Sequence, residues 1–379
     1  MTASAIEWTD KVWNPVAGCA RVSDGCRNCY AEVMAARHVL MSRAQGRESP
    51  YLPVVDAEKR RWNRKFITLP ERLADPLGWR KPARVFVNSM SDLFGEGVPF
   101  EFIAAVFGVM AATPRHTYQV LTKRPARMLE FLGWLNKIPF DKVAAGLVGD
   151  HRPWLCVRQA GQAAGQIHVQ AESLGDWPLP NVWLGVSVED QAAANERIPL
   201  LLRATAAIRF LSCEPLLGPV DLSPDTCDLC GGNDVAPADD GAPWCVECDH
   251  EMGAPGWLDP EGIDWVIVGG ESGPGARTCK VSWVRDIVRQ CSEAGVPVFV
   301  KQLGARPDFV EPLAGGGQSI ESMLRHGEYE EEPVVLRDRK GGDPAEWPED
   351  LRVRQWPEAT AIGEAENVGD ADERRAGSG

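Results

Sequence analysis

Short hydrophobic runs alternate with longer segments of helical periodicity along most of the 379-residue chain. Each run is rich in Val, Ile, Leu, Phe or Trp and ends in a polar cluster. Runs that are apolar at nearly every position are typical of strands buried on both faces, as the strands of parallel sheets are. We therefore expect at least seven strands, at residues 10–16, 83–92, 117–125, 182–190, 208–215, 263–273 and 297–304.

Helical segments separate these strands. The first begins at Tyr30, and further helices are expected at residues 100–113, 125–135, 191–205 and 281–295. Strands that alternate with helices in this way indicate βαβ units and an α/β fold. At least seven strands favour a (β/α) barrel of the TIM type, partial or full. Periodicity does not show whether the sheet closes, so a doubly wound sheet stays an alternative.

Two segments interrupt the alternation. Residues 136–180 are irregular and rich in Gly, Ala and Gln, and residues 219–262 contain four closely spaced cysteines. We predict one barrel built from residues 1–218, with 136–180 inserted in it, and residues 263–310. Residues 219–262 form an inserted module in this division. Residues 311–379 form an acidic C-terminal extension, whose end we expect to be disordered because its composition buries little surface.

Charge is distributed unevenly along the chain. The net charge is −14, and residues 311–379 contain 17 acidic and 8 basic residues, so the extension carries −9 of it. A chain of this acidity is not a general binder of polyanions, because phosphate contacts depend on Lys and Arg. The basic segment at residues 58–65 could form a local patch, although a solvated surface is the simpler interpretation.

Cysteine content and the N-terminus bear on the compartment. The first residues lack a basic and an apolar signal region, and the longest apolar run, 102–112, is shorter than the roughly 20 residues that span a bilayer. We therefore expect a cytoplasmic protein with no membrane partner. Eleven cysteines in a reducing compartment point to metal ligation or redox chemistry rather than to disulfides.

Three cysteines, Cys19, Cys26 and Cys29, follow the first predicted strand with the spacing C-x6-C-x2-C. Three thiolates without a fourth neighbour can hold a [4Fe–4S] cluster and leave one iron open to another ligand. Cys29 lies at a helix N-terminus, whose dipole favours negative charge. The alternatives are a structural zinc completed by a distant residue such as His38, a mononuclear iron site, or simple burial. Spacing does not separate zinc from a cluster.

These segments resemble a known family. The cysteine block at residues 6–32 and the runs RVFVNSMSDLF, TYQVLTKRPARM, VWLGVSVEDQ, FLSCEPLLGPV and VIVGGESGPGAR are similar, in order, to an uncharacterised phage and prophage family with a three-cysteine motif. That family itself resembles radical S-adenosylmethionine (SAM) enzymes. The resemblance covers residues 5–305, and the cysteine block and GGESGPGAR are its most specific parts.

The resemblance implies a barrel of the radical SAM type, a [4Fe–4S] cluster held by the three cysteines, and SAM bound at the open iron. Reductive cleavage of SAM by an electron donor would then yield a 5′-deoxyadenosyl radical. The phage association suggests a nucleoside, nucleotide or nucleic-acid base as substrate. The chain departs from the usual C-x3-C-x2-C spacing by three extra residues in the first gap, which makes SAM a weaker expectation than the cluster.

Polar residues close each predicted strand and would meet at one mouth of a barrel. Charges at the ends of buried strands need a partner or a ligand, so we expect some of them to be functional. The catalytic candidates are Lys123, Glu189, Glu214, Glu271 and Lys301, and the cofactor-binding candidates are Asn88, Ser89, Asp92, Ser187, Ser212, Gly269 and Gly270. The alternative is a structural ring of ion pairs, such as Lys123 with Glu189 and Lys301 with Glu271.

By analogy with superfamily barrels, Asn88 and Ser89 would hold the methionine end of SAM, and Ser187 with Glu189 its ribose. Lys123 or Lys301 would bind a carboxylate or phosphate. The glycine pair 269–270 would bring the backbone close to adenine or phosphate. Cys213 at a strand end is a possible hydrogen donor, but a buried hydrophobic residue is the simpler interpretation. Cys279 and Cys291 are expected to be structural.

The second group of cysteines has the spacing C-x2-C-x14-C-x2-C, through Cys227, Cys230, Cys245 and Cys248. Two cysteine pairs separated by a short hairpin are the signature of a structural zinc ribbon, with an auxiliary iron–sulfur cluster as the alternative. Its position after a strand end predicts a lid or recognition element over the mouth. Its acidic residues and lack of Lys and Arg argue against a grip on nucleic-acid phosphates.

Three functions follow from these features. The first is a radical-SAM-like iron–sulfur enzyme. The second is a non-catalytic binding protein stabilised by two zinc sites, with a nucleic-acid or protein partner. The third is a hydrolase or transferase that uses Glu189, Glu214 or Glu271 as acid–base groups.

Overall fold

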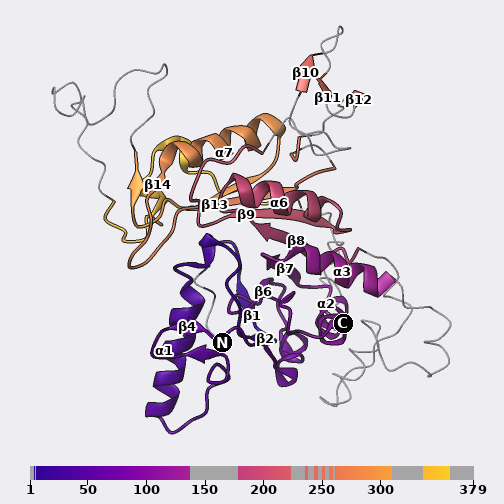
Figure 1. Ribbon diagram of the computed structural model, residues 1–379, viewed down its shortest axis with the longest axis vertical. Coiled ribbons are helices and arrows are strands. Elements are labelled where there is room, and N and C mark those ends of the chain that lie inside the picture. The colour runs from indigo at the N-terminus through magenta and orange to yellow at the C-terminus, as the bar shows by residue number, and fades with distance from the viewer. Residues whose placement is uncertain are drawn as a thin grey trace, which may run out of the picture.

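Seven parallel strands form one sheet that curls into a half-barrel (Figure 1). The computed structural model describes residues 4, 6–136, 178–222, 235–237, 243–245, 250–251, 256–258, 261–309 and 336–358. The strands lie side by side in chain order: β1 (Lys11–Trp13), β6 (Arg84–Val87), β7 (Thr117–Thr122), β8 (Val182–Ser187), β9 (Ile208–Cys213), β13 (Trp265–Gly269) and β15 (Val298–Gln302). Each expected strand is therefore confirmed.

This strand order decides between the two architectures that periodicity left open. Every neighbouring pair in the sheet is parallel. A doubly wound sheet reverses its strand order at a switch point. Because this order runs from β1 to β15 without a reversal, the doubly wound alternative was wrong. The fold is a mixed α/β half-barrel.

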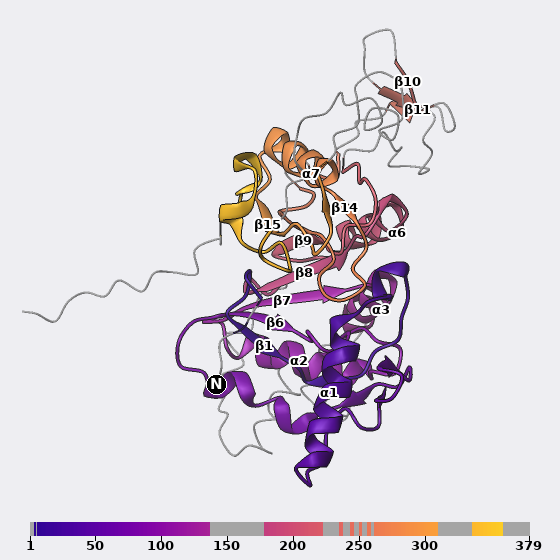
Figure 2. The same cartoon turned by 90° about the vertical axis from the view of Figure 1, so that its left-hand side faces the viewer.

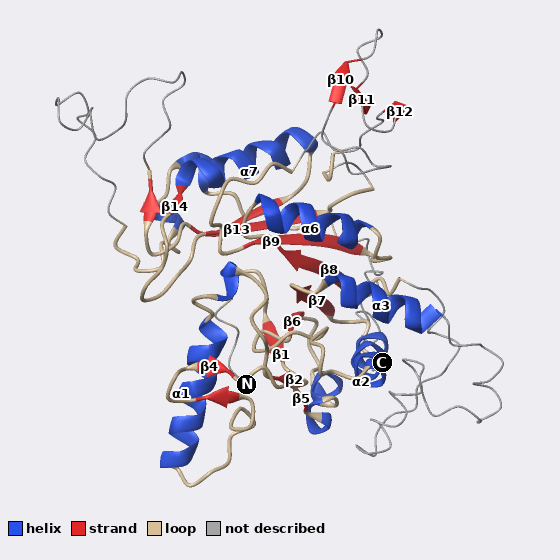
Figure 3. Ribbon diagram, in the orientation of Figure 1, coloured by secondary structure: helices blue, strands red, loops and turns tan. Residues whose placement is uncertain are grey.

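The five expected helices are also present (Figure 3). They are α1 (Tyr30–Ala44), α2 (Phe100–Ala111), α3 (Pro125–Asn136), α6 (Gln191–Leu202) and α7 (Val281–Ala294). In the outer layer α2 contacts α3 and α3 contacts α6. Two of the helices contact the sheet directly: α6 packs against β8, and α7 packs against β13 and β15 (Figure 2).

The two faces of the sheet bury different side chains. Because successive side chains on a strand point to opposite faces, one face presents aliphatic residues such as Val120 and Leu184 to the helices. The other face holds a separate aromatic cluster that includes Phe86, Trp183 and Trp265. Near the carboxyl ends of β8 and β9 the residues become small and polar, and Ser187 and Ser212 are partners in register.

A second core lies under α1. Its alanine-rich face, which includes Ala35 and Val39, packs with Tyr51 and Trp62. These partners come from the segment that forms the hairpin of β3 (Val55–Asp56) and β4 (Arg61–Trp62). The same segment continues into β5 (Ile67–Thr68), which pairs with β2 (Val16–Ala17) just before the three cysteines; short 3-10 helices lie at Asp24–Cys26, Pro70–Arg72 and Asp75–Gly78.

Residues 336–358 of the acidic extension pack on the half-barrel. They contain the 3-10 helices η5 (Pro344–Glu346) and η6 (Glu349–Leu351), and η6 contacts α7. The backbone N–H of Val300 in β15 donates to the carbonyl of Val353. Nearby, β14 (Cys279–Lys280) pairs with β16 (Pro307–Asp308). The expected disorder of the chain end concerns residues 359–379, which lie outside the described residues.

The inserted module contributes a small antiparallel sheet of β10 (Val235–Pro237), β11 (Pro243–Cys245) and β12 (His250–Glu251). These strands stand apart from the half-barrel in both views (Figures 1 and 2). Cys227, Cys230 and Cys248 lie outside the described residues, as do Cys156 and the rest of the insertion at 137–177. The zinc ligand set and the lid position therefore stay predictions. Among the described residues no helix is long and apolar enough to cross a membrane.

Candidate functional site

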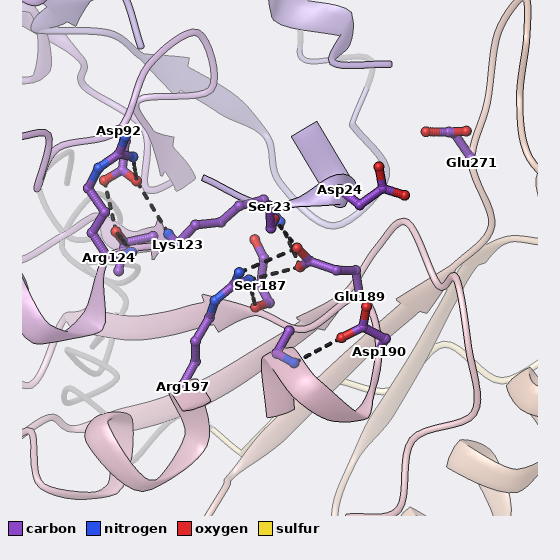
Figure 4. Close-up of polar contacts among 12 residues, drawn as sticks. Ser23, Asp24, Asp92, Lys123, Arg124, Ser187, Glu189, Asp190, Arg197 and Glu271 are labelled. Atoms are coloured by element: carbon purple, nitrogen blue, oxygen red, sulfur yellow. Dashed lines mark hydrogen bonds and ion pairs between the residues drawn. The ribbon is translucent and has the colours of Figure 1, made fainter. Parts of the chain in front are cut away.

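The three-cysteine loop, residues 19–29, lies against the carboxyl end of the sheet. The Ser23 hydroxyl donates to Glu189, just after β8 (Figure 4). The Asn28 amide donates to Glu271, after β13, at 2.9 Å. Arg124, after β7, donates to the Ala20 carbonyl at 2.8 Å. Strand ends far apart in sequence therefore hold one loop in place.

Two glycines allow the loop to pack this closely. Gly18 has a φ of 92°, and a side chain there would collide with the Lys65 carbonyl. A Cβ on Gly25 would press against the Glu189 carboxylate. Larger residues at these positions would push the loop away from the strand ends, so the glycines fix its position.

The three thiols of the loop are partly buried and influence one another. Burial and the neighbouring Asp92 carboxylate raise the pKa of Cys19 to about 12, and Cys29 and Cys26 add to the rise, whereas Arg124 opposes it. Burial likewise raises the pKa of Cys29, against the effect of the Glu32 and Ala31 backbone N–H groups at the start of α1. The raised pKa values of Cys19 and Cys29 mean that these two thiols would ionise more readily beside a bound cation.

Glu189 is the centre of the strongest polar network (Figure 4). Its carboxylate is 1% exposed and pairs with Lys123 Nζ at 3.0 Å and with an Arg197 guanidinium nitrogen at 2.8 Å. Burial raises the pKa of Glu189, but the charges of Lys123 and Arg197 outweigh it and hold the pKa at about 2. The pair of Lys123 with Glu189, an example of the structural alternative to a functional role, is present, and Glu189 is a fully paired carboxylate.

Asp92 forms a second buried network beside the loop. It accepts hydrogen bonds from the Thr122 hydroxyl at 2.8 Å and from Arg124 at 2.9 Å. The positive charge of Arg124 also works to lower the pKa of the Cys19 thiol. Asp92 was expected to bind a cofactor, but its own contacts are those of a residue that holds Arg124 between the loop and β7.

The predicted pair of Lys301 with Glu271 was wrong. Lys301 Nζ binds Glu214 at 2.6 Å, whereas Glu271 pairs with Arg277 at 2.6 Å. The Arg277 guanidinium reaches Glu271 because the turn at Gly273 and Gly275 folds the chain back. Burial raises the pKa of Glu271, but the contacts with Arg277 and Asn28 lower it overall, so this carboxylate is also ionised and paired.

The polar side chains among the cofactor-binding candidates differ in whether their atoms have hydrogen-bond partners. Asn88 directly follows β6, is 3% exposed and has a φ of 62°, and neither its amide nitrogen nor its oxygen has a hydrogen-bond partner among the residues that the structure describes. Ser89 is hydrogen bonded with Asn14 at 3.3 Å. Ser187 and Ser212 are buried side by side at the ends of β8 and β9. Of this set, Asn88 has the clearest unused binding capacity.

Gly269 and Gly270 are explained by chain packing. A Cβ on Gly270 would collide with the Leu303 carbonyl, and one on Gly269 would come within 3.1 Å of the Gln302 carbonyl oxygen. Gln302 also donates to the Gly270 carbonyl at 2.9 Å. The two glycines therefore let β13 and β15 approach each other, and a role in binding adenine or phosphate stays a prediction.

A comparison with family models identifies the family. A model described as a protein of unknown function, DUF5131, matches residues 3–333. The chain belongs to the DUF5131 family. No curated protein and no solved structure matches it. The match covers the half-barrel and the three-cysteine loop and ends before the packed segment 336–358 of this DUF5131 chain.

Several residues that contact the three-cysteine loop or its partners in this DUF5131 chain were not indicated by the sequence pattern. Ser23 and Asn28 lie between the cysteines and anchor the loop. Arg197 lies on α6, eight residues after Glu189, which itself precedes the helix, so no helical spacing rule indicated this pair. Arg277 stands within GGESGPGAR, and its pairing with Glu271 required a turn that the glycines already suggested. Tyr30 donates to the Ser89 carbonyl at 2.6 Å and joins α1 to β6.

His38, considered above as a distant zinc ligand, and the described cysteines outside the loop have other surroundings. His38 lies within 2.8 Å of the Ser49 hydroxyl and packs edge-on against Tyr51. Cys213, Cys279 and Cys291 are buried in the hydrophobic core. Within the described ranges, no group of three or more His, Cys, Asp or Glu side chains converges closely enough to hold a single metal ion.

Proposed function

We propose that this DUF5131 protein is an iron–sulfur enzyme of the radical SAM type, with Cys19, Cys26 and Cys29 as the cluster ligands. The observation that carries the proposal is the position of the three mutually interacting thiols in a loop anchored at the carboxyl ends of β7, β8 and β13. In parallel barrels this end of the sheet is where catalytic sites are built. When bound, such a cluster supplies an electron for the cleavage of SAM.

The residues around the loop fit this group. Thiolates and sulfide need positive charge and N–H donors, and Arg124 and the N-terminus of α1 lie beside the cysteines. The buried Asn88 amide has a free donor and a free acceptor, which suit the carboxylate and ammonium groups of an amino acid such as the methionine end of SAM. Ser187 remains our candidate for its ribose.

In this proposal Glu189 and Glu271 have a positioning role instead of a catalytic one, because both form ion pairs. Because Glu189 and Glu271 are ionised and held by cations, they position the loop instead of donating protons. The same pairing weighs against a hydrolase that uses them as acids. Lys301 and Glu214 form the most accessible of these pairs, with side chains 17% exposed, and are our candidates for contact with a substrate. The resemblance to phage proteins suggests that this substrate is a nucleoside, nucleotide or base.

Metal analysis after oxygen-free reconstitution tests the proposal. We expect about 4 Fe with matching acid-labile sulfide per chain, and release of 5′-deoxyadenosine from SAM with a reductant. Cys29→Ala should lose iron and SAM cleavage. Cys279→Ala, which removes a buried thiol outside the loop, is the matched control and should keep both.

A different result would favour the second function. About 2 Zn per chain, no iron and no SAM cleavage would contradict the enzyme and support a zinc-stabilised binding protein. SAM cleavage that survives in Cys29→Ala would contradict the ligand assignment.

A further inference from the structure

A cavity of about 490 Å³ lies beside the three-cysteine loop, outside the Glu189 and Glu271 networks. Its walls come from five parts of the chain: residues 20–22 of the loop, Pro53, the segment Arg64–Ile67, Glu96–Gly97 and Arg124. This volume falls within the roughly 300–1,000 Å³ that is typical of small-molecule sites.

Positive charge dominates the lining. Arg21, Arg64, Lys65 and Arg124 line the cavity, against one carboxylate, Glu96. Arg21 is paired with Glu32, and Arg124 with Asp92. The side chains of Arg64 and Lys65 form no ion pair or hydrogen bond with any residue that the structure describes. In an acidic chain, two unpaired cations at a cavity wall are available to an anion.

The wall that carries these cations is fixed in place. The Lys65 carbonyl sits where Gly18 has no side chain, and the Phe66 ring fills the space that a Cβ on Gly95 would occupy. Both contacts hold residues 64–67 tightly against the neighbouring chain. A cavity with walls fixed by backbone packing is largely pre-formed, which lowers the entropy lost on binding.

Arg64 has a backbone conformation that glycine adopts more easily. Its φ is 67°, in the left-handed region that disfavours residues with a Cβ. Arg60, which lies outside the cavity, also has a positive φ, of 52°, so this conformation alone assigns Arg64 no role; its place in the lining rests on the cavity itself.

The rest of the lining suits an apolar or aromatic body. Phe66 lies with one face beneath the Arg124 guanidinium, 5.6 Å from the ring centre, and Ile67, Val22 and Pro53 add apolar surface. Glu96 can accept hydrogen bonds from hydroxyl or amino groups. Together these groups match an aromatic, hydroxyl-bearing molecule with a phosphate at one end.

We propose that this cavity binds a small organic phosphate with an aromatic body, such as a nucleoside monophosphate, and that Arg64 and Lys65 bind its phosphate. The site goes beyond the proposed iron–sulfur chemistry and does not depend on it. A free nucleotide and a terminal nucleotide of a single strand share this chemistry.

Calorimetric titration of the full-length protein tests the site, with adenosine monophosphate, adenosine, inorganic phosphate and a short single-stranded oligonucleotide as probes. We expect the monophosphate to bind more tightly than adenosine or phosphate alone. Arg64→Gln/Lys65→Gln should weaken its binding by at least about tenfold, the loss expected for charge-assisted contacts. Arg60→Gln/Arg61→Gln, which removes equal charge from the same segment outside the cavity, should change it by less than about twofold.

The outcomes separate the possibilities. Tighter binding of the oligonucleotide than of the monophosphate, with the same loss in Arg64→Gln/Lys65→Gln, identifies a strand as the source of the ligand. Equal losses in both double variants, or monophosphate binding no tighter than that of adenosine, would overturn the proposal. Iron content and SAM cleavage, measured on the same samples, report separately on the proposed function.

Discussion

At the scale of single residues, the ionised carboxylate of Glu189 links stability to the site. Lys123 and Arg197 lower its pKa from 4.5 to about 2 in the folded protein. A carboxyl group with a lowered pKa stabilises the fold above its unfolded pKa, and this contribution is lost as the pH falls through the folded value. The contribution is about 3 kcal/mol, because one pKa unit corresponds to about 1.4 kcal/mol.

Glu189→Gln should therefore destabilise the protein at neutral pH by about 3 kcal/mol, since the buried Arg197 and the partly buried Lys123 lose their partner. As the pH falls from about 4.5 towards 2, wild type should lose stability relative to the variant and the difference should shrink. Urea unfolding between neutral pH and about pH 3 measures both effects. Glu58→Gln, an exposed site, is the control and should show neither. A constant difference across this range would contradict the role of the Glu189 charge.

The sequence identified most residues at the strand ends but only some of their partners. Lys123 and Glu189 close adjacent strands, β7 and β8, and their pairing was predictable. Lys301 was assigned to Glu271 of its neighbouring strand, but it reaches Glu214, two strands away in the sheet. Lys301 lies on the same face as Phe299, which belongs to the inner aromatic cluster, and the curl of the sheet brings alternate strands together on that face. The spacing of residues along the sequence does not reveal how strongly the sheet curls, so this pair could not be predicted.

At the scale of elements, periodicity predicted every strand of the main sheet and the five α-helices found in the described part of the chain. It did not predict the packing of residues 336–358, because that segment is polar, carries charges of both signs and is rich in turns. Two apolar side chains within it, Trp347 and Leu351, are fully buried against the half-barrel. Isolated anchors of this kind lack the repeated spacing that marks a helix or strand. The segment adds to the core through a few positions instead of a continuous face.

Trp347 tests the role of this segment. Its side chain is 2% exposed, and its indole N–H donates to the Gly341 carbonyl at 2.9 Å. Trp347→Ala should reduce the free energy of unfolding by about 3–5 kcal/mol, as expected for a large buried aromatic residue. Trp347→Phe keeps most of the packing and loses the hydrogen bond, so it should cost about 1 kcal/mol. Similar, small losses in both variants by thermal or urea unfolding would show that the segment contributes little.

At the scale of the whole molecule, the two ends of residues 219–262 belong to the main core, where Val220, Leu222, Trp257 and Leu258 are buried. The strand count and alternation of the sequence predicted a parallel α/β fold, but only the spatial order of the strands distinguishes a curled half-barrel from a doubly wound sheet. The large core joins the strands to α2, α3, α6 and α7. The module instead has its own antiparallel sheet, β10 to β12, within residues 219–262. A unit of this size has too little apolar surface for a stable core of its own.

We predict that a metal ion supplies the missing stability and that its ligands are the two cysteine pairs, Cys227 with Cys230 and Cys245 with Cys248. We expect Cys230→Ser to lose about 1 Zn per chain, because a four-cysteine site does not hold its metal with three thiolates and a hydroxyl. Proteolysis should then cut within residues 219–262 while the half-barrel keeps its melting temperature. Cys291→Ser is the contrasting variant, since this thiol is buried in the main core: it should keep the zinc and lower the melting temperature. Retention of zinc by Cys230→Ser would contradict a four-cysteine site. Unfolding of the half-barrel in this variant would contradict a module that folds independently of it.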